Sequence, residues 1–157
     1  MTPDRSNEAL VDDELDVLAA LVPIVGRDIV ELGCGAAKLA RALLERHPDT
    51  RVTGLEVDER QHAKNLASPQ AGLQFVAAGA QSIPVADASF DVALMLKSLH
   101  HVPLPLLAQA LTEVARVLRP RDHLYLTKNL SVNNVDRQRH LAERADRILM
   151  ISLRLQR

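Results

Sequence analysis

The chain has 157 residues and a mass of 17.3 kDa, which is the size of one domain. Its content of 47% hydrophobic and 25% charged residues excludes a disordered or low-complexity chain. One cysteine excludes a disulfide framework and a thiolate zinc site, so we expect a reduced, intracellular protein without a metal site. The net charge of −1 is unevenly distributed: residues 1–118 carry 10 Lys/Arg against 16 Asp/Glu, and residues 119–157 carry 9 against 4.

The N-terminal segment 1–16 is acidic and lacks the basic start and apolar core of a secretory signal. The apolar stretch that follows, Val17–Val25, is interrupted by Pro23. It is far shorter than the roughly 20 residues that a membrane-spanning helix needs. We therefore expect a cytoplasmic protein that does not associate with membranes.

Apolar spacing and turn signals predict alternating helices and strands. Apolar residues at helical spacing within 7–22 predict a leading helix. The β-branched run 28–32 predicts a strand that ends at Gly33-Cys34-Gly35, and leucines at 39, 43 and 44 mark the next helix. The alternation continues with a strand at 51–56, a helix at 59–66, strands at 73–77 and 90–96, a helix at 104–118 and a strand at 123–128.

Strands separated by helices cannot pair as hairpins and favour crossover connections. The sequence therefore predicts an α/β fold, a doubly wound parallel sheet, with residues 1–130 forming the domain. After Leu130 the pattern changes to a turn-like segment and a basic helix with an apolar stripe at Leu141, Ala145, Ile148 and Leu149. We interpret 131–157 as a basic C-terminal helical tail and not as a separate domain.

The loop after the first predicted strand is the candidate ligand site, because open parallel sheets bind ligands beyond the carboxyl ends of their strands. Gly33 and Gly35 let the backbone approach a ligand, and the next helix offers unpaired N–H groups. A dinucleotide loop has a small residue where this chain has Lys38, and Glu31 would repel a pyrophosphate, which disfavours an NAD-dependent oxidoreductase. A carboxylate beside the loop suits a ligand with an ammonium or sulfonium group, and the helix N-terminus suits a ligand carboxylate, so a cofactor that carries an amino acid fits both.

The next strand ends at Glu56, about 20 residues beyond the loop, where acidic side chains hydrogen-bond a ribose diol. Each carboxylate oxygen can accept from one hydroxyl, so Glu56 is the ribose candidate and Asp58 the alternative. No histidine or other base is placed near Cys34 by the sequence, and we expect it to be a small packing residue without chemistry.

Five motifs, in this order, resemble the class I S-adenosylmethionine-dependent methyltransferases of the methyltransferase domain 11 type, which act on small molecules. The resemblance runs from about Ile29 to Leu126 and implies a sheet of strand order 3-2-1-4-5, completed in full-length members by a sixth and a seventh strand. The motifs are Glu31-Leu-Gly-Cys-Gly35, Val52-Thr-Gly-Leu-Glu56, Ile83-Pro84 before Ser89-Phe-Asp-Val92, Leu99-His-His-Val102 and Glu113-Val-Ala-Arg-Val-Leu-Arg-Pro120.

The resemblance implies S-adenosylmethionine as the cofactor and methyl transfer to a small-molecule acceptor as the reaction. By position, Glu31, Gly33 and Gly35 would line the methionine part, Glu56 would hold the ribose, Ala80 and Gln81 would lie along the adenine, and Lys97 and Ser98 would line the floor near the methyl group. Leu32, Cys34, Lys38 and Val57 complete the implied cofactor-binding set.

Methyl transfer needs no dedicated base, because holding the acceptor against an activated methyl group in a dry site is largely sufficient. If the acceptor must lose a proton, His100 and His101 are the nearest candidates. A structural role at the end of the fourth strand is equally open for both.

Three departures from the family pattern stand out. Members usually carry an acidic residue that accepts from the adenine amino group where this chain has Gly79, so we expect that contact to be lost. Members usually enter the fifth strand through Pro-Gly-Gly, whereas Pro120-Arg121-Asp122 predicts a changed turn. We also expect the chain to be truncated or altered after about residue 120, without the usual sixth and seventh strands.

The alternative function is a non-catalytic binding or assembly module of the same fold. The Arg-rich tail could attract phosphates, but the aromatic residues are only Phe75, Phe90 and Tyr125, so we expect no nucleic-acid partner. An open fifth-strand edge, or the apolar stripe of the tail, predicts a homodimer. The acceptor is not identified by the sequence.

Overall fold

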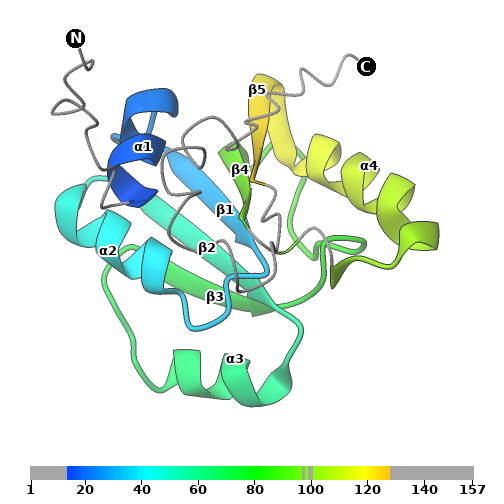
Figure 1. Ribbon diagram of the computed structural model, residues 1–157, viewed down its shortest axis with the longest axis horizontal. Coiled ribbons are helices and arrows are strands. Elements are labelled where there is room, and N and C mark those ends of the chain that lie inside the picture. Colours follow the sequence, from blue (N-terminus) through cyan, green and yellow to red (C-terminus); the bar gives the residue numbers. More distant parts are fainter. Residues whose placement is uncertain (1–13, 97, 99–100, 128–157) are drawn as a thin grey trace, which may run out of the picture.

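A computed structural model describes residues 14–96, 98 and 101–127 of the chain. These residues form a five-stranded sheet with helices packed against it (Figure 1). In chain order the elements are α1 (Glu14–Leu21), β1 (Asp28–Leu32), α2 (Lys38–Arg46), β2 (Arg51–Glu56), α3 (Glu59–Leu66), β3 (Leu73–Ala77), β4 (Phe90–Leu96), the 3-10 turn η2 (Leu104–Leu106), α4 (Leu107–Val117) and β5 (Leu118–Thr127).

The sheet is parallel throughout and has the order β3-β2-β1-β4-β5. Strand order reverses at β1, which pairs with β2 on one side and with β4 on the other. The predicted α/β fold and strand order 3-2-1-4-5 are therefore confirmed. The predicted tail, the boundary at residue 130 and any sixth or seventh strand lie outside the described residues, and the homodimer stays a prediction.

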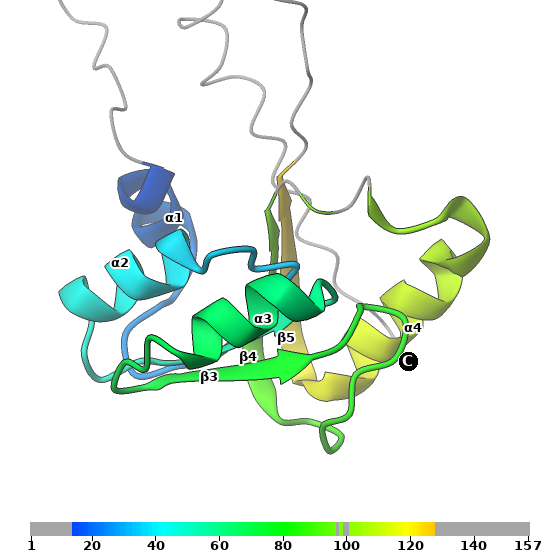
Figure 2. The same cartoon turned by 90° about the horizontal axis from the view of Figure 1, so that it is seen from below.

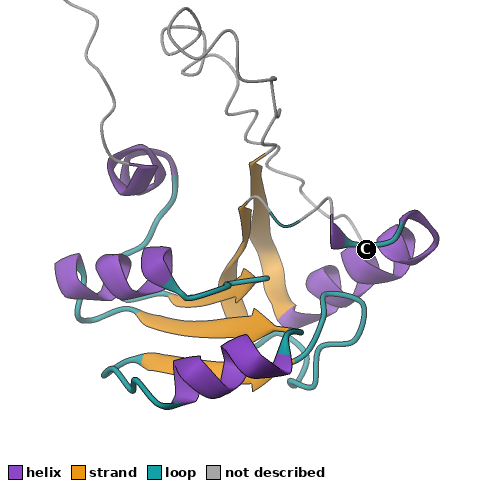
Figure 3. Cartoon of the chain, turned by 60° about the horizontal axis from the view of Figure 1, so that its bottom comes forward, coloured by secondary structure: helices purple, strands orange, loops and turns teal. Residues whose placement is uncertain are grey.

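Helices cover both faces of the sheet, so β1 is buried on both sides. Successive side chains of a strand point to opposite faces. Ile29 packs in the cluster that contains residues of α1 and α2, and Val30 packs in the cluster that contains residues of α4. Figure 3 shows α1 and α2 apart from α4, with the strands between them, and Figure 2 shows α3 lying along β3. This two-sided burial explains why successive residues of β1 are buried, and why β4 is apolar at every position from Val92 to Leu96.

The predicted start of the last strand was wrong, because β5 begins at Leu118 and not at residue 123. The helix before it also differs from the predicted span 104–118: residues 104–106 form η2, and α4 ends at Val117. Pro120-Arg121-Asp122, expected to be a turn, is part of β5. The pairing of β5 with β4 shifts register between Phe90 and Val92, and such an irregularity absorbs extra residues without ending a strand.

Ion pairs join four strands at their amino ends and explain this early start of β5. Arg119 contacts Asp91 at 2.8 Å and Asp28 at 3.1 Å, and Asp28 also contacts Arg51 at 2.6 Å. The Arg51 guanidinium, and then that of Arg119, lower the pKa of Asp28. Arg119 is thereby held beside β1 and β4 as soon as the chain leaves α4.

No helix in the described part of the chain is both long enough and apolar enough to cross a membrane.

Replacing Leu55 by alanine should destabilise the fold strongly. Leu55 is 0% exposed in the middle of the α4-side core, and deleting a buried leucine side chain costs about 2–5 kcal/mol. Leu104 is 84% exposed, so Leu104→Ala is the matched control and should change the free energy of unfolding by less than about 0.5 kcal/mol. Urea unfolding followed by circular dichroism measures both values, and equal effects would contradict the assignment of Leu55 to the core.

Candidate functional site

The β1–α2 loop leaves the sheet through three left-handed backbone positions. Gly33 has a φ of +69°, Gly35 of +55° and Ala37 of +57°. A Cβ on Gly33 would lie 2.6 Å from the Cβ of Ser98, so glycine also lets the loop pass this side chain. Ala37 is fully buried and is the N-cap residue of α2, so the start of this helix has no side-chain cap. The left-handed alanine was missed at the sequence level, because alanine gives no signal for this conformation.

Gly35 is held on both sides by side chains from the neighbouring elements. Its N–H donates to Oε2 of Glu56 at 2.8 Å, and its carbonyl accepts from Nδ2 of Asn65 at 2.8 Å. Asn65 is 3% exposed, and its Oδ1 accepts from Nε2 of Gln61, one helical turn earlier on α3. Sequence reasoning missed Asn65, whose only signal is this spacing on a polar helix.

The Glu56 carboxylate lies at the end of β2. Within the described residues, the hydrogen bonds that it accepts all come from backbone N–H groups. Oε2 accepts from Gly35, and Oε1 accepts from the N–H of Asp58 at 2.9 Å. Each carboxylate oxygen has two acceptor sites, so each keeps one for a ligand hydroxyl. Val57, which lies between Glu56 and Asp58 in the sequence, is 68% exposed and offers an apolar surface beside the carboxylate.

Asp58, the alternative ribose candidate, caps α3. Its Oδ1 accepts from the N–H groups of Arg60 at 2.8 Å and Gln61 at 3.1 Å. A side-chain oxygen in this position satisfies the otherwise unpaired donors at a helix start. Asp58 therefore has a structural role at the start of α3, and the assignment of Glu56 as the ribose ligand stays a prediction.

Glu31 and Ser98 lie under the glycine loop. Glu31 is 6% exposed on β1, between Gly54 of β2 and Leu94 of β4 in the register of the sheet. Ser98 is 8% exposed, and its Oγ donates to the carbonyl of Leu32 at 2.6 Å. Since this bond uses the only hydroxyl hydrogen, Ser98 can offer a ligand an acceptor but no donor.

The thiol of Cys34 is buried beside two carboxylates. Cys34 is 8% exposed, and its N–H donates to the carbonyl of Leu55 at 2.9 Å. Burial, followed by the negative charges of Glu31 and Glu56, raises the pKa of Cys34 to about 12. A thiol that stays protonated at neutral pH is a poor nucleophile, as expected for a packing residue.

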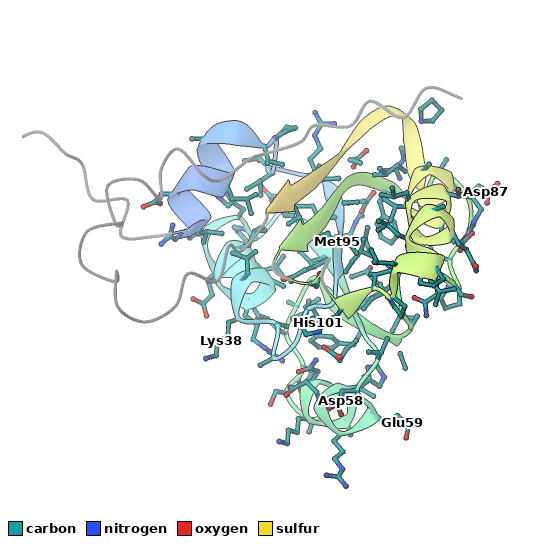
Figure 4. The ribbon with its side chains drawn as sticks, turned by 45° about the vertical axis from the view of Figure 1, so that its right-hand side comes forward. Lys38, Asp58, Glu59, Asp87, Met95 and His101 are labelled. Atoms are coloured by element: carbon teal, nitrogen blue, oxygen red, sulfur yellow. The ribbon has the colours of Figure 1, made fainter. Side chains whose placement is uncertain are left out.

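The loop after β3 is clamped by α4. Gln109 donates through Nε2 to the carbonyl of Gln81 at 2.8 Å. One helical turn on, Glu113 accepts from the N–H of Ile83 at 2.9 Å and Arg116 donates to the carbonyl of Ile83 at 2.7 Å. Arg116 and the Ile83 N–H hold the pKa of Glu113 down at about 2. The same arginine donates to Asp87, which Figure 4 shows beside α4.

The parallel register brings these segments to one edge of the sheet. Leu32 pairs with Leu55, and Glu56 pairs with Ala77, so the loops after β1, β2 and β3 leave the sheet side by side. Lys38 is exposed at the start of α2, and His101 is exposed after β4 (Figure 4). Lys97 and His100 lie outside the described residues. No group of residues suited to hold a metal ion occurs within 14–96, 98 and 101–127.

This sheet order, with a glycine loop after β1 and a carboxylate after β2, defines the Rossmann-like class of nucleotide-cofactor proteins. The family model described as "Methyltransferase domain" matches residues 29–121, and the chain belongs to this family.

The proteins similar to this chain include methyltransferases and a cyclase. A 27-O-demethylrifamycin SV methyltransferase from Amycolatopsis mediterranei is 35% identical over 71% of this chain and 42% of its own length. An S-adenosylmethionine dependent methyltransferase from Mesorhizobium loti has a crystal structure similar to this fold, with a TM-score of 0.60 and 29% identity over 71% of this chain and 51% of that chain. The [4+2]-cyclase SpnF has a TM-score of 0.64 and 26% identity over 73% of this chain and 43% of that chain.

The chain spans 42–49% of the length of the first curated relatives that it matches.

Cys34 should resist alkylation in the folded protein. With a pKa raised from 9.0 to about 12, the thiolate fraction at pH 8 is about a thousandfold below that of an ordinary thiol. We expect intact-mass spectrometry to show almost no reaction with iodoacetamide at pH 8, and one adduct per chain in about 8 M urea, a concentration that unfolds small domains. A Cys34→Ser variant should gain no adduct. Equal rates with and without urea would contradict the buried thiol.

Glu113→Gln should weaken the acid dependence of stability. The pKa of Glu113 is lowered from 4.5 to about 2 in the folded state. Its contribution to the free energy of unfolding is therefore complete above pH 4.5 and is lost as the pH falls toward 2, where the folded protein also becomes protonated at Glu113. We expect the substitution to lower the free energy of unfolding at pH 7 by about 1–3 kcal/mol and to flatten its decline between about pH 5 and 3.

Urea midpoints across this pH range measure the effect, with Glu45→Gln at an exposed position of α2 as the control. A Glu113→Gln protein with the pH profile of the unsubstituted chain would show that the α4 clamp contributes nothing.

Proposed function

We propose that this chain binds S-adenosylmethionine at the carboxyl edge of its sheet and that the protein transfers the methyl group to a small-molecule acceptor. The observation that carries the proposal is the Glu56 carboxylate, which is fixed by Gly35 and Asp58 N–H groups and keeps one acceptor site on each oxygen. Membership of the methyltransferase domain family supports the reaction class.

The residues present fit the chemical parts of this cofactor. A ribose diol has two hydroxyl donors, which match the two remaining acceptor sites of Glu56. The methionine part has an ammonium group, which suits the buried carboxylate of Glu31 and the acceptor of Ser98. Its carboxylate suits the first turn of α2, which contains no acidic side chain and begins at Lys38.

S-adenosylmethionine supplies a methyl group already activated by its bond to a positive sulfur. The chain's own residues then have to bind, orient and exclude water. Glu56 and the glycine loop would fix the cofactor, and the segment after β4, with His101 exposed, would face the acceptor. Any base is proposed to be His100 or His101, in line with the chemistry of histidine near neutral pH. Lys97 is proposed to line the floor near the methyl group.

The alternative is a non-catalytic module of the same fold. One observation favours it: position 79, where family members usually carry an acidic side chain, is glycine in this chain. The [4+2]-cyclase SpnF, 26% identical to this chain, has a similar fold but is named for a different reaction, so the fold alone does not define the activity. Cofactor binding without turnover of any acceptor would favour this alternative.

Calorimetric titration with S-adenosylhomocysteine tests the binding step. We expect micromolar affinity that Glu56→Ala weakens by about 1–3 kcal/mol, which is roughly tenfold to a hundredfold, because charge-assisted hydrogen bonds are lost. Glu56→Gln removes the charge but keeps an oxygen that can accept from the Gly35 N–H. Comparison with Glu56→Ala therefore separates the effect of the charge from the effect of the hydrogen bond that holds the loop. Glu59→Gln, an exposed position on α3, is the control and should bind normally. NAD should not bind.

The folded chain's failure to bind S-adenosylhomocysteine would overturn the proposed function.

A further inference from the structure

The carboxamide of Gln81 occupies the volume that a side chain at position 79 would need. A Cβ built on Gly79 would lie 2.6 Å from Oε1, 2.9 Å from Nε2 and 3.0 Å from Cδ of Gln81. These distances are shorter than real carbon contacts, so a side chain at 79 and this orientation of Gln81 exclude each other. Positions 79 and 81 therefore share one place on the β3 loop, and in this chain Gln81 fills it.

The main chain of Gln81 is anchored while its carboxamide is available. Gln109 on α4 donates to the carbonyl of Gln81, and the clamp of Ile83 by Glu113 and Arg116 fixes the loop two residues further on. Ala80, the residue before Gln81, is 7% exposed and packs in the α4-side core. Within the described part of the chain, the half-buried Gln81 carboxamide forms no hydrogen bond of its own. A fixed backbone with an unused donor and acceptor is suited to recognise a ligand.

The loop that carries Gln81 leaves the sheet beside the end of β2, where Glu56 lies. Glu56 at the end of β2 pairs with Ala77 at the end of β3, and the loop with Gln81 starts directly after Ala77. Val57, 68% exposed beside Glu56, provides an apolar surface for a planar ring. A carboxamide offers the donor–acceptor pair that complements adenine.

We propose that Gln81 recognises the adenine of the cofactor through its carboxamide at the 6-amino group, in the place that an acidic residue at position 79 would otherwise take. The inference rests on the proposed function, since it assumes that the nucleoside is bound at Glu56. The carboxamide oxygen accepts from the amino group. Rotated by half a turn, the same group donates to a carbonyl oxygen, so Gln81 tolerates hypoxanthine, whereas a carboxylate would repel it.

The test is calorimetric titration of the 157-residue chain with S-adenosylhomocysteine and with S-inosylhomocysteine, in which hypoxanthine replaces adenine. We expect the unsubstituted chain to bind both within about threefold, because the carboxamide can turn to suit either base. Gln81→Ala should weaken both by about tenfold, the value of one lost hydrogen bond. Gln81→Glu should keep adenine and weaken hypoxanthine at least about tenfold, because two acceptors then face each other.

Two further variants separate recognition from loop structure. Gly79→Asp combined with Gln81→Ala removes the overlap and places a carboxylate at the same site, and we expect it to prefer adenine as Gln81→Glu does. The φ of Gly79 lies outside the left-handed region, so aspartate is compatible with this backbone. Gln74→Glu, an exposed position on β3, makes the same change of charge nearby and should leave the ratio of the two affinities unchanged.

A merely structural role would lower both affinities in Gln81→Ala but would not move the ratio of adenine to hypoxanthine in Gln81→Glu. The inference is overturned if Gln81→Ala binds both ligands like the unsubstituted chain, or if Gln81→Glu keeps the original ratio. Binding of neither ligand by the unsubstituted chain would instead overturn the proposed function, and the inference with it.

Discussion

The hydrogen bond from the Gly35 N–H to Oε2 of Glu56 is the interaction on which the candidate site depends, because it joins the loop after β1 to the end of β2. The two strands are already paired in register, so the bond closes a short rigid ring at the sheet edge. Asn65 completes it from α3 by donating to the carbonyl of the same glycine. The loop is thereby ordered before any ligand arrives, which lowers the entropy that binding would otherwise cost.

The two ends of the sheet use charge differently. At the amino ends, Asp28 and Asp91 pair with Arg51 and Arg119, so that the charges cancel in ion pairs that join β1, β2, β4 and β5. At the carboxyl ends, Glu56 and Asp58 are held by backbone N–H groups, which stabilise a carboxylate without cancelling its charge. The first arrangement closes the fold, and the second leaves negative charge where a cationic or hydroxyl-bearing ligand would bind.

Most of the fold could be predicted from the sequence because local and tertiary signals agree over β1 to β4. The strand at 51–56 and the helix at 59–66 match their predicted bounds, since an apolar run and a capping Asp58 mark them locally. The start of β5 could not be predicted this way. Its first residues are polar and include Pro120, and they are held in the sheet by ion pairs of Arg119 with residues far away in sequence.

The candidate site divides along the same line. Glu56 and the two glycines of the loop were predicted from spacing, because the geometry of a β–loop–α unit places them whatever the rest of the chain does. Asn65 and the left-handed Ala37 have no such signal, since they depend on contacts formed only after α3 and α2 dock on the sheet. Gln81 was named from the resemblance, as lying along the adenine, but only the overlap with position 79 shows where its carboxamide lies.

Recognition of the cofactor and recognition of the acceptor are separable in this architecture. Glu31, Glu56 and Gln81 all come from segments between β1 and α4, whose positions are fixed by the sheet and by the α4 clamp. The proposed acceptor would instead meet the segment after β4, where His101 is exposed. Under the proposed function, the core would therefore keep one cofactor while the surrounding segments change, and the proposed recognition group would lie at position 81 instead of 79 without a change in the sheet.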